Sequence, residues 1–169
     1  MVVLAPSEEQ VIVANLGEIH ISNAPEVVLS CLGVGSCIAL CIYDPQVKVG
    51  GIAHIVLPNS NGKPKDAKGA TKYADIAVPH LLNMIRESGA LRSRLQIKLA
   101  GGSQMFVGGS ASSFNTGENN YESVKQVLAD EALKISAADV GGNKGRTIRL
   151  SVATGRVTVK TVGGEEKEL

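Results

Sequence analysis

Short runs of apolar residues, separated by turn-forming residues, make up most of this chain. Runs of Val, Ile, Leu and Ala that are bounded by glycine, proline or asparagine are typical of β-strands. Strands are predicted over residues 11–14, 26–30, 37–43, 48–57, 95–100, 146–152 and 156–161, with a further one near 135–140. Ala153-Thr154-Gly155 predicts a hairpin turn between the last two strands.

Two segments carry their apolar residues at helical spacing instead. A helix is predicted over 71–88, where Pro79 either kinks the helix or marks a start close to that residue. A second helix is predicted over 119–133. Residues 60–69 and 103–117 are rich in glycine and polar residues and predict surface loops. The pattern indicates the α/β or α+β class, with helices covering a mixed sheet.

Residues 1–169 are predicted to form one domain. Composition and charge narrow the classes of function that this domain can have. The net charge is +1 and only 3% of the residues are aromatic, so binding to nucleic acid is not expected. The odd number of cysteines, three in all, argues against a disulfide framework and indicates reduced thiols in a cytoplasmic protein. Residues 1–6 do not resemble a signal peptide, and no apolar run is long enough to predict membrane insertion.

Cys37 is the candidate nucleophile, because it follows the glycine hinge 33–36 and opens an apolar run. His54 lies in the next apolar run, and pairing of the two runs as strands would let thiol and imidazole face each other. The amides of residues 35–37 could then bind an oxyanion. A thiolate at neutral pH would need the imidazolium of His54 to lower the pKa of Cys37. The residues alone leave open a second interpretation, in which Cys37 is a small buried apolar residue and His54 a core histidine.

Other candidate sites in the sequence are weaker, and no cofactor is predicted. A zinc site built from the cysteines and His54 is disfavoured, because their spacing matches no structural zinc pattern. One strand also cannot direct both Cys37 and Cys41 to the same ion. The glycine-rich segment 101–106 lacks the Gly-Lys-Ser/Thr ending of a phosphate loop. It predicts a tight turn that inserts Met105 and Phe106 into the core.

Several separated motifs, in order and spread over nearly the whole chain, resemble the CheD family of chemoreceptor glutamine deamidases. These motifs are 32–37 (LGVGSC), 43–45 (YDP), 51–58 (GIAHIVLP), 72–75 (KYAD), 100–106 (AGGSQMF) and 139–143 (DVGGN). The resemblance implies a cysteine hydrolase that converts glutamine side chains of methyl-accepting chemotaxis receptors to glutamate. Cys37 matches the family nucleophile and His54 the family base.

The resemblance also carries expectations about fold and partners. It implies a three-layer α-β-β sandwich with mixed sheets, related to bacterial deamidase toxins of the cytotoxic necrotizing factor type. It implies binding to CheC, a phosphatase of the chemotaxis response regulator, which suppresses the deamidase. Glutamate methyl esters would react by the same route, since only the leaving group changes. The lysines of the loop are interpreted as a solvated surface, with contact to acidic receptor faces as the minority interpretation: Lys63, Lys65, Lys68 and Lys72.

The sequence departs from the family pattern at Cys31, where relatives often have a threonine as the third member of the site. A thiol hydrogen-bonds more weakly than a hydroxyl. Three interpretations stay open: Cys31 substitutes imperfectly, Ser30 or another group orients His54, or the deamidase is weakened and an adaptor role dominates. Asn119 is a second departure, because relatives tend to have arginine before Asn120. A peptidase is a weaker third function.

Overall fold

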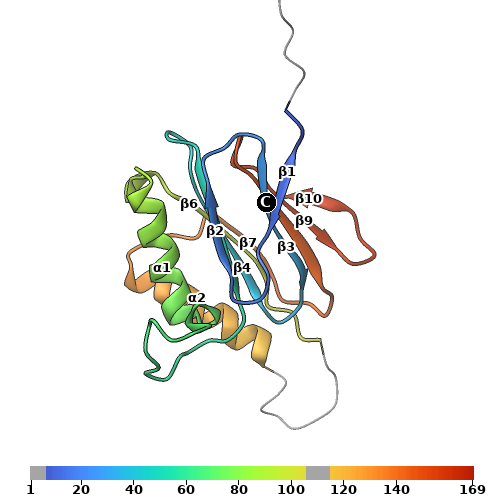
Figure 1. Ribbon diagram of the computed structural model, residues 1–169. Coiled ribbons are helices and arrows are strands. Elements are labelled where there is room, and N and C mark those ends of the chain that lie inside the picture. Colours follow the sequence, from blue (N-terminus) through green and yellow to red (C-terminus); the bar gives the residue numbers. More distant parts are fainter. Residues whose placement is uncertain (1–6, 106–114) are drawn as a thin grey trace, which may run out of the picture.

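The computed structural model describes residues 7–105 and 115–169. Two five-stranded mixed sheets pack face to face, and two helices cover the outer face of the second sheet (Figure 1). The first sheet has the order β1-β3-β8-β9-β10 and the second the order β2-β5-β4-β6-β7. The strands are β1 Gln10–Val13, β2 Ile19–Ser22, β3 Val27–Val34, β4 Ile38–Asp44, β5 Val49–Ile55, β6 Gln96–Gly101, β7 Ala137–Val140, β8 Arg146–Ser151, β9 Val157–Thr161 and β10 Glu166–Glu168. This arrangement confirms the predicted α+β class with mixed sheets.

Strand β4 lies at the centre of the second sheet, antiparallel to both β5 and β6. All of its residues are buried, because one face meets the helices and the other meets the first sheet. Ile38, Leu40 and Ile42 belong to the core under the helices, whereas Ala39 and Cys41 belong to the core between the sheets. Burial on both faces explains why this run is continuously apolar instead of alternating.

The helices are α1 Ala74–Glu87 and α2 Thr116–Asp130, with short 3-10 helices η1 Ala70–Lys72 and η2 Arg92–Arg94. Helix α1 begins three residues later than predicted and contains Pro79 in its interior. Its buried face includes Ala77, Leu81 and Ile85 and packs on the second sheet. Leu81 and Ile85 come so close to Gly51 of β5 that a methyl group there would collide with both. Glycine at this position therefore lets the helix approach the sheet.

Two strands were not predicted, and both lie at sheet edges. Strand β2 pairs with β5 and alternates only over Ile19-His20-Ile21-Ser22, with every residue half-buried. Strand β10 consists of Glu166, Lys167 and Glu168, all exposed. Charged residues are common on edge strands, where they discourage further pairing, so neither segment carries the apolar signal used to predict the other strands.

Candidate active site

Strand pairing places Cys37 and His54 on the same face of the second sheet. In the β4–β5 register Ala39 lies opposite His54, and Cys37 precedes Ala39 by two residues. Side chains two residues apart on a strand point to the same face, and Cys37 packs against the core between the two sheets. Cys37 is half-buried and His54 is 3% exposed. The pair therefore lies where the sheets meet, with the thiol nearer the surface.

A backbone carbonyl fixes the orientation of the His54 ring. Nδ1 lies 3.0 Å from the carbonyl oxygen of Ala14, which directly follows β1. Since a carbonyl only accepts, Nδ1 carries the proton and Nε2 is left as an acceptor. Nε2 is buried and has no hydrogen-bond partner among the residues that the structure describes. This is the tautomer that a general base needs, with its lone pair on the nitrogen away from the anchor.

Burial acts on the ionisation of both groups. It raises the pKa of the Cys37 thiol above its ordinary value, although the thiol's own backbone amide opposes the rise. It lowers the pKa of His54 below 6.5, and the Ala14 carbonyl and the Glu18 carboxylate oppose that shift. Both shifts favour the neutral form, the thiol for Cys37 and the uncharged imidazole for His54. The thiolate–imidazolium pair stays a prediction, which these shifts do not favour.

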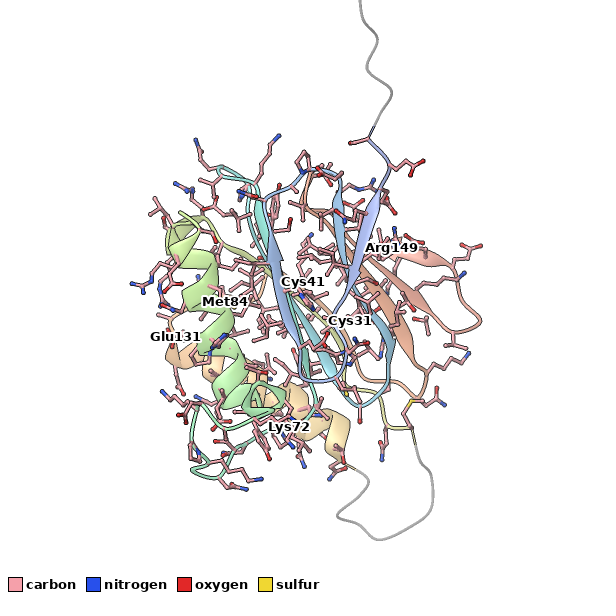
Figure 2. The ribbon with its side chains drawn as sticks, viewed as in Figure 1. Cys31, Cys41, Lys72, Met84, Glu131 and Arg149 are labelled. Carbon is pink, nitrogen blue, oxygen red and sulfur yellow. The ribbon has the colours of Figure 1, made fainter. Side chains whose placement is uncertain are left out.

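Cys31 lies on β3 within the same core, and among the described residues no hydrogen bond joins it to His54. Its side chain is fully buried between the sheets (Figure 2). Burial and the neighbouring thiols of Cys41 and Cys37 raise its pKa far above the ordinary value. Ser30 is also engaged elsewhere, because its hydroxyl donates to the carbonyl of Ile148 at 2.8 Å. The group that contacts His54 is thus the Ala14 carbonyl, which a residue-type pattern could not have revealed.

The loop that carries Cys37 is held through its carbonyl groups. Ser103 N donates to Gly35 O at 2.9 Å, and Gly102 N donates to Cys37 O at 2.8 Å. Gly101 has a φ of 122°, and any side chain there would collide with the Cys37 carbonyl. Within residues 7–105 and 115–169, the amides of residues 35–37 bond to no backbone acceptor. They stay the candidate donors to a negatively charged oxygen.

Asn120 ties this loop to the histidine strand, and it was missed as a site residue. It is fully buried on α2, and its Nδ2 donates to Ser36 O and to Val56 O, each at 2.9 Å. Ser36 precedes Cys37, and Val56 follows the end of β5. Its Oδ1 is buried without a partner. One amide side chain therefore fixes the spacing between the two segments that supply the thiol and the imidazole.

The glycine-rich segment after β6 differs from its prediction. Met105 is 45% exposed and would contact any side chain at Gly35, so its insertion into the core is wrong. Phe106 lies outside the described residues. The turn itself is held by buried Arg146, whose guanidinium donates to Ser103 Oγ at 2.7 Å and to Gly141 O at 2.8 Å. This network fixes the segment that in turn holds the Cys37 loop.

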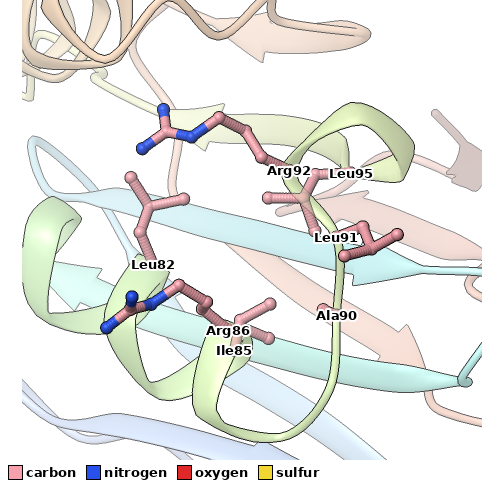
Figure 3. A pocket seen from close by; sticks show the side chains of 7 residues that line it. All are labelled: Leu82, Ile85, Arg86, Ala90, Leu91, Arg92 and Leu95. Atoms are coloured by element: carbon pink, nitrogen blue, oxygen red, sulfur yellow. The ribbon is translucent and has the colours of Figure 1, made fainter.

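An apolar pocket of about 170 Å³ lies at the other end of β4 from Cys37 (Figure 3). Its walls come from the end of α1 and from η2, with Arg86 and Arg92 among the lining side chains. Leu91, also in its wall, bonds through its amide to Asp44, the last residue of β4. The length of β4 separates this pocket from the thiol, so the pocket does not contribute to the Cys37 site.

The part of the chain that the structure describes contains neither a metal-binding cluster nor a membrane-spanning helix. No group of three or more His, Cys, Asp and Glu side chains there could hold a metal ion. No helix in the same residues has both the length and the apolar character needed to cross a membrane.

Comparison with known proteins identifies relatives of the whole chain. The profile of the family described as CheD chemotactic sensory transduction matches residues 56–161. The "Chemoreceptor glutamine deamidase CheD" of Thermotoga maritima is 42% identical over 155 residues, which cover 92% of this chain and 94% of that protein. The chain belongs to the CheD family. The "Probable chemoreceptor glutamine deamidase CheD" of Symbiobacterium thermophilum is 41% identical over 165 residues, covering 96% of this chain and 99% of that protein.

A solved structure resembles the CheD chain only distantly. The Bacillus licheniformis hypothetical protein YfiH covers 80% of this chain and 60% of its own length, at 13% identity and a TM-score of 0.44. That likeness is too low to support any statement about function.

Proposed function

We propose that this CheD protein is a cysteine-dependent protein-glutamine glutaminase that converts glutamine side chains of chemoreceptors to glutamate and releases ammonia. The relatives named chemoreceptor glutamine deamidase support the reaction and the substrate. One observation carries the mechanism: the buried, unpartnered Nε2 of His54 faces the same side of the sheet as the half-exposed thiol of Cys37.

The first half of the reaction forms a thioester. The Cys37 sulfur attacks the side-chain carbonyl carbon of glutamine while His54 Nε2 takes the thiol proton. The amides of Ser36 and Cys37 stabilise the oxyanion. The Ala14 carbonyl, which accepts from Nδ1, stabilises the imidazolium that forms. When the tetrahedral intermediate collapses, the carbon–nitrogen bond breaks and His54 returns the proton to the departing nitrogen, so ammonia leaves and a thioester remains.

The second half restores the thiol. Water attacks the thioester carbon as His54 Nε2 takes a proton from it. The carbon–sulfur bond then breaks, the sulfur regains a proton from His54, and glutamate is released. One water is consumed and one ammonia is formed per turn, and no oxidant or metal takes part. A glutamate methyl ester would react by the same steps, with methanol as the leaving group, and we propose it as a second substrate.

The orientation of His54 favours an enzyme over the alternative, a non-catalytic adaptor. That alternative rested on Cys31 as a poor orienting group. Because the Ala14 carbonyl occupies Nδ1, loss of a hydroxyl at position 31 does not leave the ring unanchored, which favours the enzyme. We keep binding to CheC and action in the cytoplasm as proposals, the latter supported by three free cysteines.

The test is ammonia release from a chemoreceptor cytoplasmic fragment. Wild-type protein is compared with Cys37→Ala and His54→Ala, with Cys41→Ala as the matched control. Cys41 lies on β4, on the face that Cys37 also occupies just before the strand, but it is buried away from the surface. We expect release by the wild type and the control only. Full activity in Cys37→Ala or in His54→Ala would overturn the proposed mechanism.

A further inference from the structure

Two lysine side chains converge on one tyrosine ring beside the candidate active site. The ammonium groups of Lys63 and Lys72 each lie 5.2 Å from the centre of the Tyr73 ring. Lys63 also donates a hydrogen bond of 2.7 Å to the Tyr73 hydroxyl. The ring belongs to a buried residue, and both charges lie against it. These two side chains are called the lysine pair below.

The lysine pair is connected to the His54 strand by short contacts. The amides of Val56 and Leu57, which follow β5, donate to the Lys72 carbonyl at 2.9 and 3.0 Å. On the other side, Gly17 N donates to His54 O at 2.9 Å, and a methyl group at Gly17 would lie only 3.1 Å from Lys72 Cβ. Lys72 is therefore fixed at the end of the molecule where the β1–β2 turn and the Cys37 loop also lie (Figures 1 and 2).

The positive charge of the pair is not neutralised within the part of the chain that the structure describes. No carboxylate there forms a salt bridge with Lys63 or Lys72. Two acids close in sequence to these contacts are engaged elsewhere: Glu18 accepts from Asn15 N at 2.8 Å and contacts His20, and Asp75 accepts from Ser60 N and Oγ. Two like charges held together without a counter-ion repel each other, and an external anion would relieve that repulsion.

We propose that the lysine pair binds a carboxylate of the substrate segment, so that the enzyme selects glutamines that have an acidic residue close by in the substrate. The inference rests on the proposed function and adds a specificity element to it. The ammonium groups sit on flexible stems and act as point charges, so either glutamate or aspartate would satisfy them. Because the reaction itself turns glutamine into glutamate, one converted position would promote capture of its neighbour.

The test measures binding separately from turnover. The chain carries Cys37→Ala, and the probe is a fluorescent synthetic peptide with one glutamine and nearby glutamates, compared with the same peptide bearing alanine at those glutamates. Binding is followed by anisotropy at low and high salt. The charge-reversed variant is Lys63→Glu with Lys72→Glu, and the matched control is Lys65→Glu with Lys68→Glu. Both control positions are exposed in the same loop and the net charge changes equally.

We expect the acidic peptide to bind about tenfold more weakly to the reversed pair than to the control, and the alanine peptide to bind both equally. High salt should remove the preference of the unreversed protein for the acidic peptide. Equal weakening in the two variants, or no preference between the peptides, would overturn the inference. If the double variant Lys63→Glu with Lys72→Glu has a lower unfolding temperature than the wild type, the single variant Lys63→Gln is used in its place. The exposed Lys63 side chain can change without disturbing Lys72.

A parallel kinetic arm separates this inference from the proposed function. Protein with Cys37 intact is assayed for ammonia release from both peptides and from a receptor fragment. Release from none of them, with selective binding still present, would contradict the deamidase and leave the carboxylate site standing. Release from both peptides at equal KM would contradict the carboxylate site and leave the deamidase standing.

Discussion

Polar side chains are buried near both ends of strand β4, but their hydrogen bonding differs. Asp44 ends β4 itself, and His54 lies on β5 near the start of β4. At one end, the carboxylate of Asp44 is fully buried and accepts from Gln46 N, Leu91 N and the Arg94 guanidinium at 2.8–3.1 Å. At the other end, His54 is bonded through Nδ1 only, and its Nε2 is buried without a partner.

The number of hydrogen bonds distinguishes a carboxylate that stabilises the fold from an imidazole that suits the proposed catalysis. Burial alone would raise the pKa of Asp44, but its hydrogen bonds with Arg94, Leu91 and Gln46 outweigh burial and hold the pKa at about 2. That carboxylate has no capacity left for a substrate. Nε2 of His54 keeps a free lone pair at the cost of an unmade hydrogen bond, about 1–3 kcal/mol for a buried polar atom. An incomplete set of bonds therefore marks the end that we propose to be reactive.

The largest effect should come from removing the thiol at the reactive end. Cys37→Ala should lower deamidation by at least about 10⁴-fold, because the covalent route is lost. The free energy of unfolding should change by less than about 1 kcal/mol, since the side chain is only half-buried. Ammonia release and urea unfolding measure the two quantities. A variant that loses stability in proportion to activity would show that Cys37 is a packing residue.

Removing the Asp44 carboxylate, at the other end of β4, should lower stability and leave activity nearly unchanged. Asp44→Ala should lower the free energy of unfolding by about 3 kcal/mol, because the buried amides and Arg94 lose their acceptor. The activity of the remaining folded protein should stay close to that of the wild type. Urea unfolding together with activity per folded molecule checks this. A large loss of activity with little loss of stability would contradict the assignment of Asp44 to structure alone.

The same carboxylate should make stability depend on pH in a narrow acidic window. The folded pKa of about 2 lies below the ordinary value of 3.8, so the unfolded chain binds the proton first as the pH falls. The stabilisation, about 2 kcal/mol, is fully present above 3.8 and is lost as the pH drops through 2. Unfolding between pH 5 and pH 2 should show a flatter pH dependence in Asp44→Asn. An unchanged slope would contradict this origin.

Loosening the clamp between thiol and imidazole should have a moderate effect. Asn120→Ala removes the bonds to Ser36 O and Val56 O and should lower kcat by about tenfold, because the two catalytic segments lose their fixed spacing. KM should change little. Ser123 on the same helix donates to Pro58 O, and Ser123→Ala serves as the matched control. Equal effects of the two variants on kcat would mean that α2 merely packs against the loop.

The smallest effect concerns the pH profile of kcat/KM. Because burial lowers the pKa of His54 below 6.5, the acid limb should lie below that value, with activity rising as His54 loses its proton. The raised pKa of Cys37 should leave the profile flat from there to above pH 8. An acid limb above 6.5 would indicate that a protonated His54 is favoured, as in a thiolate–imidazolium pair.

The sequence predicted the parts of this fold that apolar periodicity encodes. The strands that became β4 and β5, the two helices and the β8–β9 hairpin follow from buried apolar runs and turn residues, with boundaries shifted by a few positions. Edge strands β2 and β10 were missed because their residues are polar or only half-buried.

For the site, side-chain chemistry pointed to Cys37 and His54, whose roles stay proposals, and pairing of their strands was predicted correctly. The Ala14 carbonyl could not be predicted, because every residue carries one and only the fold decides which meets the ring. Asn120 was named only as the neighbour of Asn119, and its clamping contacts depend on how α2 docks. The effect of burial on the pKa of both groups could not be predicted, because it depends on how the sheets pack.

The central claim, covalent attack by Cys37, is tested most directly by intercepting the acyl-enzyme. A chemoreceptor fragment is incubated with the enzyme in the presence of hydroxylamine, which attacks thioesters in place of water. Peptide mass spectrometry then reads the fate of each glutamine. We predict glutamyl hydroxamate at the positions that otherwise become glutamate, with wild-type protein and not with Cys37→Ala. Conversion to glutamate alone at saturating hydroxylamine, or any conversion by Cys37→Ala, would contradict the account.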